Sequence, residues 1–98
     1  MNPLEATKNE VELQRPMMKT LVIHNADDVS FQQVWAVLGQ AMHFPIQICR
    51  QIAVQAHRDG TADLFTASRE VVEARLHVCE RVASDVGCEQ LPFSVRDA

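Results

Sequence analysis

Two short polar stretches of this chain hold the residues best suited to bind a small cation. Residues Asn25 to Asp28 read Asn-Ala-Asp-Asp and lie between a strand-like run, Thr20 to His24, and an amphipathic helix. Residues His57 to Gly60 read His-Arg-Asp-Gly and close a second amphipathic helix. Amide, carboxylate and imidazole groups all accept hydrogen bonds. An Asn, an Asp and a His at these turns are therefore able to converge on one small cationic group.

The same residues have ordinary structural explanations, which stay open at the level of the sequence. Asn25 is a turn former that tolerates left-handed backbone, and Asp27 and Asp28 are typical of solvated turns beside a helix N-terminus. His57 stands at the end of a helix, where the helix dipole favours it. A binding site is thus one hypothesis beside a set of well-placed turn residues.

Motifs for catalysis or metal binding do not appear elsewhere in the chain. The G-x-S-x-G, P-loop and G-x-G-x-x-G patterns are absent. A zinc cluster of His24, Asp27 and His57 has nothing to fix its geometry, so we expect no metal and no cofactor. We also expect no enzymatic activity. A small hydrolase with a Cys–His pair is the least supported alternative, although Cys88 falls in a loose turn.

Length, charge and cysteine content narrow the class of protein further. A chain of 98 residues makes one small domain. Its net charge of −4 argues against a nucleic-acid partner, and no apolar run approaches the ~20 residues of a membrane span. Three widely spaced cysteines, with Cys49 and Cys79 at core-facing helix positions, indicate reduced thiols in a cytoplasmic protein. Residues 1–17 are polar and irregular and are predicted to form a flexible tail.

Hydrophobic periodicity predicts three helices after this tail. The first follows Ser30, whose capping-box pattern with Gln33 marks a helix N-terminus. The second ends at Gly60, and the third runs from Ser68 to Gly87. The apolar stripe of the first helix is Phe31, Val34, Trp35, Leu38 and Met42. The apolar face of the second is Ile48, Cys49, Ile52, Ala53 and Ala56.

Short strands are expected at 20–24, 61–65 and 91–95, where β-branched or alternating apolar residues occur. The resulting order is strand, helix, helix, strand, helix, strand. This order favours an α+β fold over residues 18–98, a two-layer sandwich in which three helices cover one face of a three-stranded antiparallel sheet.

The order and the motifs together resemble the ClpS family, the bacterial adaptors that hand N-degron substrates to the ATP-dependent Clp protease. The family pattern Asn-Asp-Asp, a linking residue, then Thr-Pro-Met corresponds to Asn25 through Phe31. The pattern Val-His-x-x-Gly corresponds to Ala56 through Gly60, and Thr-x-Glu corresponds to Ser68 through Glu70. The resemblance covers about four-fifths of the chain, from Met18 to Ala98, and needs one extra residue near Ser84 to Cys88.

By this resemblance, part of the site would hold a free α-amino group, which has three donors and no acceptor. In ClpS proteins an Asn, a first Asp and a His bind that group, and they correspond here to Asn25, Ala26 and His57. The family's second Asp contacts the backbone of the first substrate residue and corresponds to Asp27. Because Ala26 lacks the carboxylate, either Asp27 or Asp28 replaces its charge, or the chain no longer binds an amino terminus tightly.

The resemblance also implies a side-chain pocket and a docking surface. Ala53 and Ala56 stand where the family has larger residues, which would widen the pocket. We therefore predict that Phe, Trp or Leu fits as the first residue of a substrate. Glu70 and Arg75 stand where the family has a Glu and a Lys that dock on the N-terminal domain of the Clp AAA+ unfoldase. The implied pocket residues are Phe31, Val34, Ala53, Ala56 and Leu91.

The leading functional hypothesis is a cytoplasmic, non-enzymatic adaptor. Such an adaptor would bind peptide or protein substrates with a bulky apolar N-terminal residue and deliver them to a Clp AAA+ protease. The alternative is a ClpS-like interaction domain that docks on a chaperone or other partner without N-degron recognition. Ala26 is the residue that separates the two hypotheses.

Overall fold

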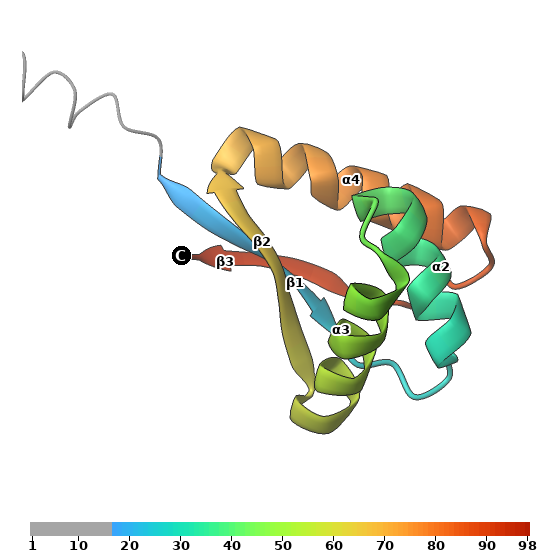
Figure 1. Ribbon diagram of the computed structural model, residues 1–98. Coiled ribbons are helices and arrows are strands. Elements are labelled where there is room, and N and C mark those ends of the chain that lie inside the picture. Colours follow the sequence, from blue (N-terminus) through green and yellow to red (C-terminus); the bar gives the residue numbers. More distant parts are fainter. Residues whose placement is uncertain (1–16) are drawn as a thin grey trace, which may run out of the picture.

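The chain forms one three-stranded antiparallel sheet over the residues that the structure describes. The computed structural model describes residues 17–98. The central strand is β1 (Met18–His24), and β2 (Thr61–Ser68) and β3 (Phe93–Asp97) pair with it on opposite sides (Figure 1). The predicted tail, residues 1–17, lies outside the described residues except for Met17.

Three helices pack against one another and against this sheet. They are α2 (Phe31–Met42), α3 (Ile46–Asp59) and α4 (Arg69–Asp85). Helix α4 contacts all three strands, α3 contacts β2, and α2 packs on both α3 and α4 (Figure 1). The predicted α+β fold with the order strand, helix, helix, strand, helix, strand is therefore confirmed.

The start of α2 is fixed by the capping box that the sequence predicted. The Ser30 hydroxyl accepts a hydrogen bond from the backbone N–H of Gln33 at 3.1 Å. In return, the Ser30 backbone N–H donates to Gln33 Oε1 at 2.9 Å. These bonds satisfy two backbone donors of the chain at the helix entry. They hold Phe31 at the first position of the helix, next to the turn that follows β1.

The end of α3 depends on Gly60, which adopts a left-handed backbone with φ of 87°. Its N–H donates to the carbonyl oxygen of Ala56 at 2.8 Å, and its own carbonyl accepts from the backbone N–H of Asn25 at 2.9 Å. This residue therefore ends the helix and also ties it to the loop after β1. Glycine adopts this conformation without the steric cost that a Cβ adds.

Several local predictions differ from the structure. The strand β1 begins at Met18 instead of Thr20, and β2 continues to Ser68, because the two strands pair antiparallel along the whole of β1, from Met18 with Ser68 to His24 with Thr61. The last strand is Phe93–Asp97, shifted toward the C-terminus of the predicted 91–95. Pro92 lies just before this strand, where its carbonyl accepts from the His24 N–H at 2.9 Å.

Burial also differs from the prediction at a few positions. Cys88 was predicted in a loose turn but is fully buried. Gly87, with φ of 81°, folds the chain back so that the Cys88 N–H reaches the Ala83 carbonyl at 2.8 Å. Ile48, predicted on the buried face of the second helix, is exposed, as is Val71 in the first turn of α4. The apolar spacing predicted buried helix faces that are wider than those observed, since only a narrow stripe of each helix reaches the core.

Alanine substitutions at two glycines should have opposite effects on stability. In Gly60→Ala, we expect the free energy of unfolding to fall by about 1 kcal/mol, because a Cβ disfavours the left-handed backbone. In Gly39→Ala, within α2, an added Cβ meets no atom within 4 Å. There we expect a rise of roughly 0.5–1 kcal/mol, because alanine loses less backbone entropy on folding. Urea-induced unfolding measures both changes, and an unchanged or raised free energy of unfolding in Gly60→Ala would contradict this account of Gly60.

Candidate functional site

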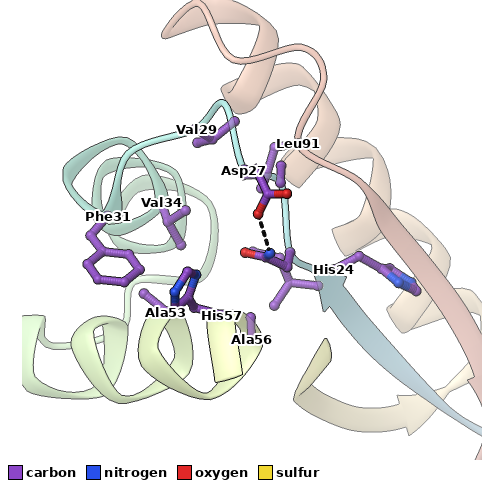
Figure 2. A pocket seen from close by; sticks show the side chains of 12 residues that line it. His24, Asp27, Val29, Phe31, Val34, Ala53, Ala56, His57 and Leu91 are labelled. Carbon is purple, nitrogen blue, oxygen red and sulfur yellow. Dashed lines mark hydrogen bonds between the residues drawn. The ribbon is translucent and has the colours of Figure 1, made fainter. Parts of the chain in front are cut away.

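One cavity of about 220 Å³ opens between the loop after β1, the first turns of α2 and the C-terminal half of α3. The eight residues predicted to bind a substrate all line it, although they come from four separate parts of the chain (Figure 2). The lining residues are Ile23, His24, Asn25, Ala26, Asp27, Val29, Phe31, Val34, Ala53, Ala56, His57 and Leu91.

Two backbone hydrogen bonds hold these chain segments together. The Asn25 N–H bonds to the Gly60 carbonyl, and the His24 N–H bonds to the Pro92 carbonyl, each at 2.9 Å. The first brings the loop after β1 to the end of α3, and the second brings the segment before β3 to the same place. Leu91, one residue before Pro92, is buried and reaches the cavity for this reason.

The polar side of the cavity presents hydrogen-bond acceptors. Asn25 Nδ2 donates to Asp27 Oδ1 at 2.9 Å (Figure 2). This bond turns the amide so that Asn25 Oδ1 is left without a donor from residues 17–98, and Asp27 Oδ2 is likewise left without one. Among the residues of 17–98 that are not exposed, the one buried side-chain nitrogen or oxygen that lacks a partner is Trp35 Nε1, so the unbonded Asn25 Oδ1 is accessible. Asp27 and His57 are exposed residues, and their carboxylate and imidazole, with the Asn25 amide oxygen, are acceptor types suited to an ammonium group.

The structure distinguishes between the two acids of the loop. Both are exposed, but only Asp27 lines the cavity. Ala26 is half-buried, lines the cavity and packs against the hydrophobic core, and its carbonyl accepts from the Val29 N–H at 3.1 Å. The ClpS family has a carboxylate at the position of Ala26. Asp27 is the next residue in the sequence, and its carboxylate faces the cavity.

The apolar side of the cavity is formed by two helices that face each other. Val34 comes from α2, and Ala53 and Ala56 come from α3; all three are buried (Figure 2). Phe31 stands at the mouth and is 40% exposed, and its ring meets that of His57 at 86° with 5.5 Å between the centroids. The cavity therefore has an apolar interior, an aromatic mouth and a polar side.

Sequence reasoning missed three lining residues, Ile23, His24 and Val29. Val29 lies within the motif stretch, and His24 and Ile23 are the two residues just before it, so proximity to the motif is the signal that would have found them. Ile23 faces the core from β1, and His24 Nε2 hydrogen-bonds with Ser94 Oγ at 2.7 Å. Val29 is buried in the loop before α2.

The two residues predicted for docking lie on α4, away from the cavity. Glu70 is exposed in the first turn of the helix. Arg75 is half-buried, and its Nη1 donates to the Ala41 carbonyl at the end of α2 at 2.8 Å. They are five positions apart, so they differ by about 140° around the helix axis. Arg75 consequently anchors α2 to α4, and it also lines a shallow depression with Val71, Ala74 and Val78.

The three cysteines are free and buried, and none of them lines the cavity. Burial raises the pKa of the thiol of Cys49 and of Cys88, and it raises the pKa of Cys79 to about 11. Because the thiolate is the nucleophilic form, this geometry gives a Cys–His hydrolase no support. In the described part of the chain, no group of three or more His, Cys, Asp or Glu residues could hold a metal ion. No helix of residues 17–98 is long and apolar enough to cross a membrane.

Comparison with known proteins finds a similar fold among the solved structures. No family model matches the sequence, and no curated protein matches it either. The solved structures do contain a similar fold, that of ClpS proteins. The structure of Agrobacterium tumefaciens ClpS2 bound to L-phenylalaninamide matches with a TM-score of 0.78 and 21% sequence identity, over 86% of this chain and 100% of that one. The resemblance drawn from the motifs is therefore confirmed at the level of the fold.

The buried thiol of Cys79 should make stability depend on alkaline pH. In the unfolded chain a thiol ionises near pH ~8.5, whereas Cys79 in the folded chain ionises at about 11. Between these values the unfolded chain binds fewer protons, so this stabilising contribution is complete below pH ~8.5 and is lost toward pH 11. The free energy of unfolding should fall with a slope of up to about 1.4 kcal/mol per pH unit.

Urea unfolding between pH 8 and pH 11 measures this slope, and Cys79→Ala is the control. Because the variant lacks the thiol, its slope should be flatter than that of the unmodified chain over the same range. Parallel slopes would show that Cys79 does not titrate as its burial requires.

Proposed function

We propose that this protein is a non-enzymatic adaptor. It binds the free α-amino group and the bulky apolar side chain of a substrate's N-terminal residue, and it delivers that substrate to a Clp AAA+ protease in the cytoplasm. Residues 18–98 form the adaptor domain. The observation that carries the proposal is one cavity in which an apolar interior adjoins three accessible hydrogen-bond acceptors.

The acceptors suit an α-amino group better than most other ligands. An ammonium donates three hydrogen bonds and accepts none. Asn25 offers an amide oxygen whose orientation is set by Asp27, Asp27 offers a second, charged oxygen, and His57 in its neutral form offers a ring nitrogen. A charged acceptor roughly doubles the strength of a hydrogen bond to a cation, so Asp27 is the strongest of the three.

The apolar interior has room for a large side chain. A cavity of about 150 Å³ lined by aliphatic and aromatic residues holds benzene, and this cavity measures about 220 Å³. Ala53 and Ala56 leave that space open because their side chains end at Cβ. The similarly folded ClpS2 is bound to L-phenylalaninamide, a ligand with a free α-amino group and a phenyl ring, and this supports the same class of ligand here.

Delivery to the unfoldase would use the exposed side of α4. Glu70 offers an anion, and Val71, 52% exposed, continues into the depression formed with Ala74 and Val78. Arg75 adds a cation at the edge of this surface while it holds the Ala41 carbonyl. An exposed apolar residue between charges is typical of a protein contact surface.

A second candidate function has one observation in its favour. Ala26 removes a carboxylate that the family uses to bind the α-amino group, while the fold and the α4 surface are kept. The chain would then act as an interaction domain that docks on a chaperone or another partner without recognising N-degrons.

Fluorescence anisotropy of labelled peptides distinguishes these functions. We expect peptides with Phe, Trp or Leu at the first position to bind, peptides with Glu to bind far more weakly, and acetylation of the amino terminus to abolish binding. Asp27→Asn should weaken binding of a Phe peptide roughly tenfold, because it removes a charge-assisted hydrogen bond of ~1.5–3 kcal/mol. Asp28→Asn is the matched control and should leave affinity unchanged, because Asp28 does not line the cavity. Binding that is indifferent to acetylation would rule out the adaptor and leave the interaction domain.

Restoring the missing carboxylate should strengthen binding. In Ala26→Asp, we expect affinity for a free Phe peptide to rise roughly tenfold or more, because a charge-assisted hydrogen bond to an ammonium is worth ~1.5–3 kcal/mol. Ala26→Asn adds a side chain of nearly the same size without the charge, and its gain should be much smaller. Equal effects of both variants would show that the carboxylate does not meet the α-amino group.

A further inference from the structure

Two aromatic rings meet at the mouth of the cavity. Phe31 and His57 lie with their centroids 5.5 Å apart and their planes at 86°, which is the edge-to-face arrangement that aromatic quadrupoles favour. Phe31 leaves 40% of its surface exposed, although a large apolar side chain at a helix start is usually able to turn inward. The capping box of Ser30 and Gln33 fixes its backbone, and therefore the place from which the ring extends.

The contact with Phe31 is the interaction that orients the imidazole of His57 within residues 17–98. Its ring nitrogens form no hydrogen bond with residues 17–98, whereas the ring of His24 is held by Ser94 Oγ at 2.7 Å. A functional histidine commonly has its orientation set by a hydrogen bond to one ring nitrogen. In His57 the contact with Phe31 takes this role, and both ring nitrogens remain available to a ligand.

An aromatic ring in the cavity would join this pair. The interior walls, Val34, Ala53, Ala56 and Leu91, are aliphatic and do not distinguish an aromatic side chain from an aliphatic one of equal size. Phe31 and His57 do distinguish the two, because contact between aromatic rings contributes binding free energy beyond that of the buried apolar area. A phenyl or indole group would complete a cluster of three rings, while a saturated side chain would only fill the space.

We infer that Phe31 makes the site selective for aromatic first residues, and that it does so while positioning the His57 imidazole for the α-amino group. This inference rests on the proposed function and narrows its substrate class. Phe and Trp are the preferred first residues, and Leu and Met are bound less tightly. The selectivity comes from the Phe31–His57 pair and not from the size of the cavity.

A pair of peptides that differ only in aromaticity tests the inference. One begins with phenylalanine and the other with cyclohexylalanine, each with a free α-amino group and the same following sequence. In the unmodified chain we expect the phenylalanine peptide to bind roughly twofold to tenfold more tightly. In Phe31→Leu the ratio should fall to about one, and in Phe31→Tyr, which keeps the ring, the preference should return. Phe44→Leu is the matched control, since Phe44 does not line the cavity, and it should keep the preference.

The imidazole gives a second measurement that needs no peptide. In nuclear magnetic resonance spectra of the free chain, the ring current of Phe31 should shift the His57 imidazole protons, and this shift should disappear in Phe31→Leu and persist in Phe31→Tyr. A His57 spectrum that is the same in all three chains would overturn the positioning role.

The outcomes separate this inference from the proposed function. If both peptides bind equally to the unmodified chain, and only with a free α-amino group, the aromatic selectivity is wrong and the adaptor function stands. If Phe31→Leu keeps the preference, the selectivity does not come from Phe31 and the inference is overturned. If neither peptide binds, or acetylation makes no difference, the proposed function fails and the inference fails with it.

Discussion

The hydrogen bond from the Asn25 N–H to the Gly60 carbonyl is the interaction on which the site depends. It joins the loop after the central strand to the end of α3, two segments that are 35 residues apart in the sequence (60 − 25). Gly60 makes the bond possible because its left-handed backbone both ends the helix and turns its carbonyl toward the loop. The pairing of His24 with Thr61 in the sheet holds the same two segments together, so this bond and the strand pairing jointly set the position of Asn25 and Asp27 relative to His57. The polar half of the cavity therefore depends on one helix C-cap and on the strand pairing beside it.

The apolar half of the cavity exists because the side chains that α3 presents there are short. Ala53 and Ala56 place short side chains where longer ones would fill the gap, and unfilled apolar space lowers stability because contacts are lost. The rest of the domain compensates with a well-buried core behind the cavity, built from β1, α2 and α4. Its largest fully buried side chains are those of Leu21, Ile23, Val37, Leu38 and Val72. The cavity thus lies at the edge of the core, and the stability of the domain comes from the filled part of the core.

Much of this arrangement could be predicted from sequence, and the failures have a common physical cause. The capping box at Ser30 and the C-cap at Gly60 were predicted correctly, because each is decided by residues within a few positions of it. The eight cavity residues were brought together by order and spacing relative to a known family, and their shared location is now clear, while their roles stay predictions. Burial of Cys88 and the anchoring of Arg75 on the Ala41 carbonyl were not foreseen. Both depend on contacts between distant segments, which no local pattern encodes.

Under the proposed function, the charge of Asp27 would compensate for the carboxylate that Ala26 lacks. A substrate ammonium that entered the cavity would lose water, and an acceptor that carries charge offsets this loss better than a neutral one. Ala26 contributes no charge and packs against the core. Asp27 carries a charge, and its bond to Asn25 Nδ2 orients the neutral amide beside it. One carboxylate would then both attract the ammonium and orient its neighbour. The proposed affinity would accordingly be more sensitive to Asp27 than in a site with two carboxylates.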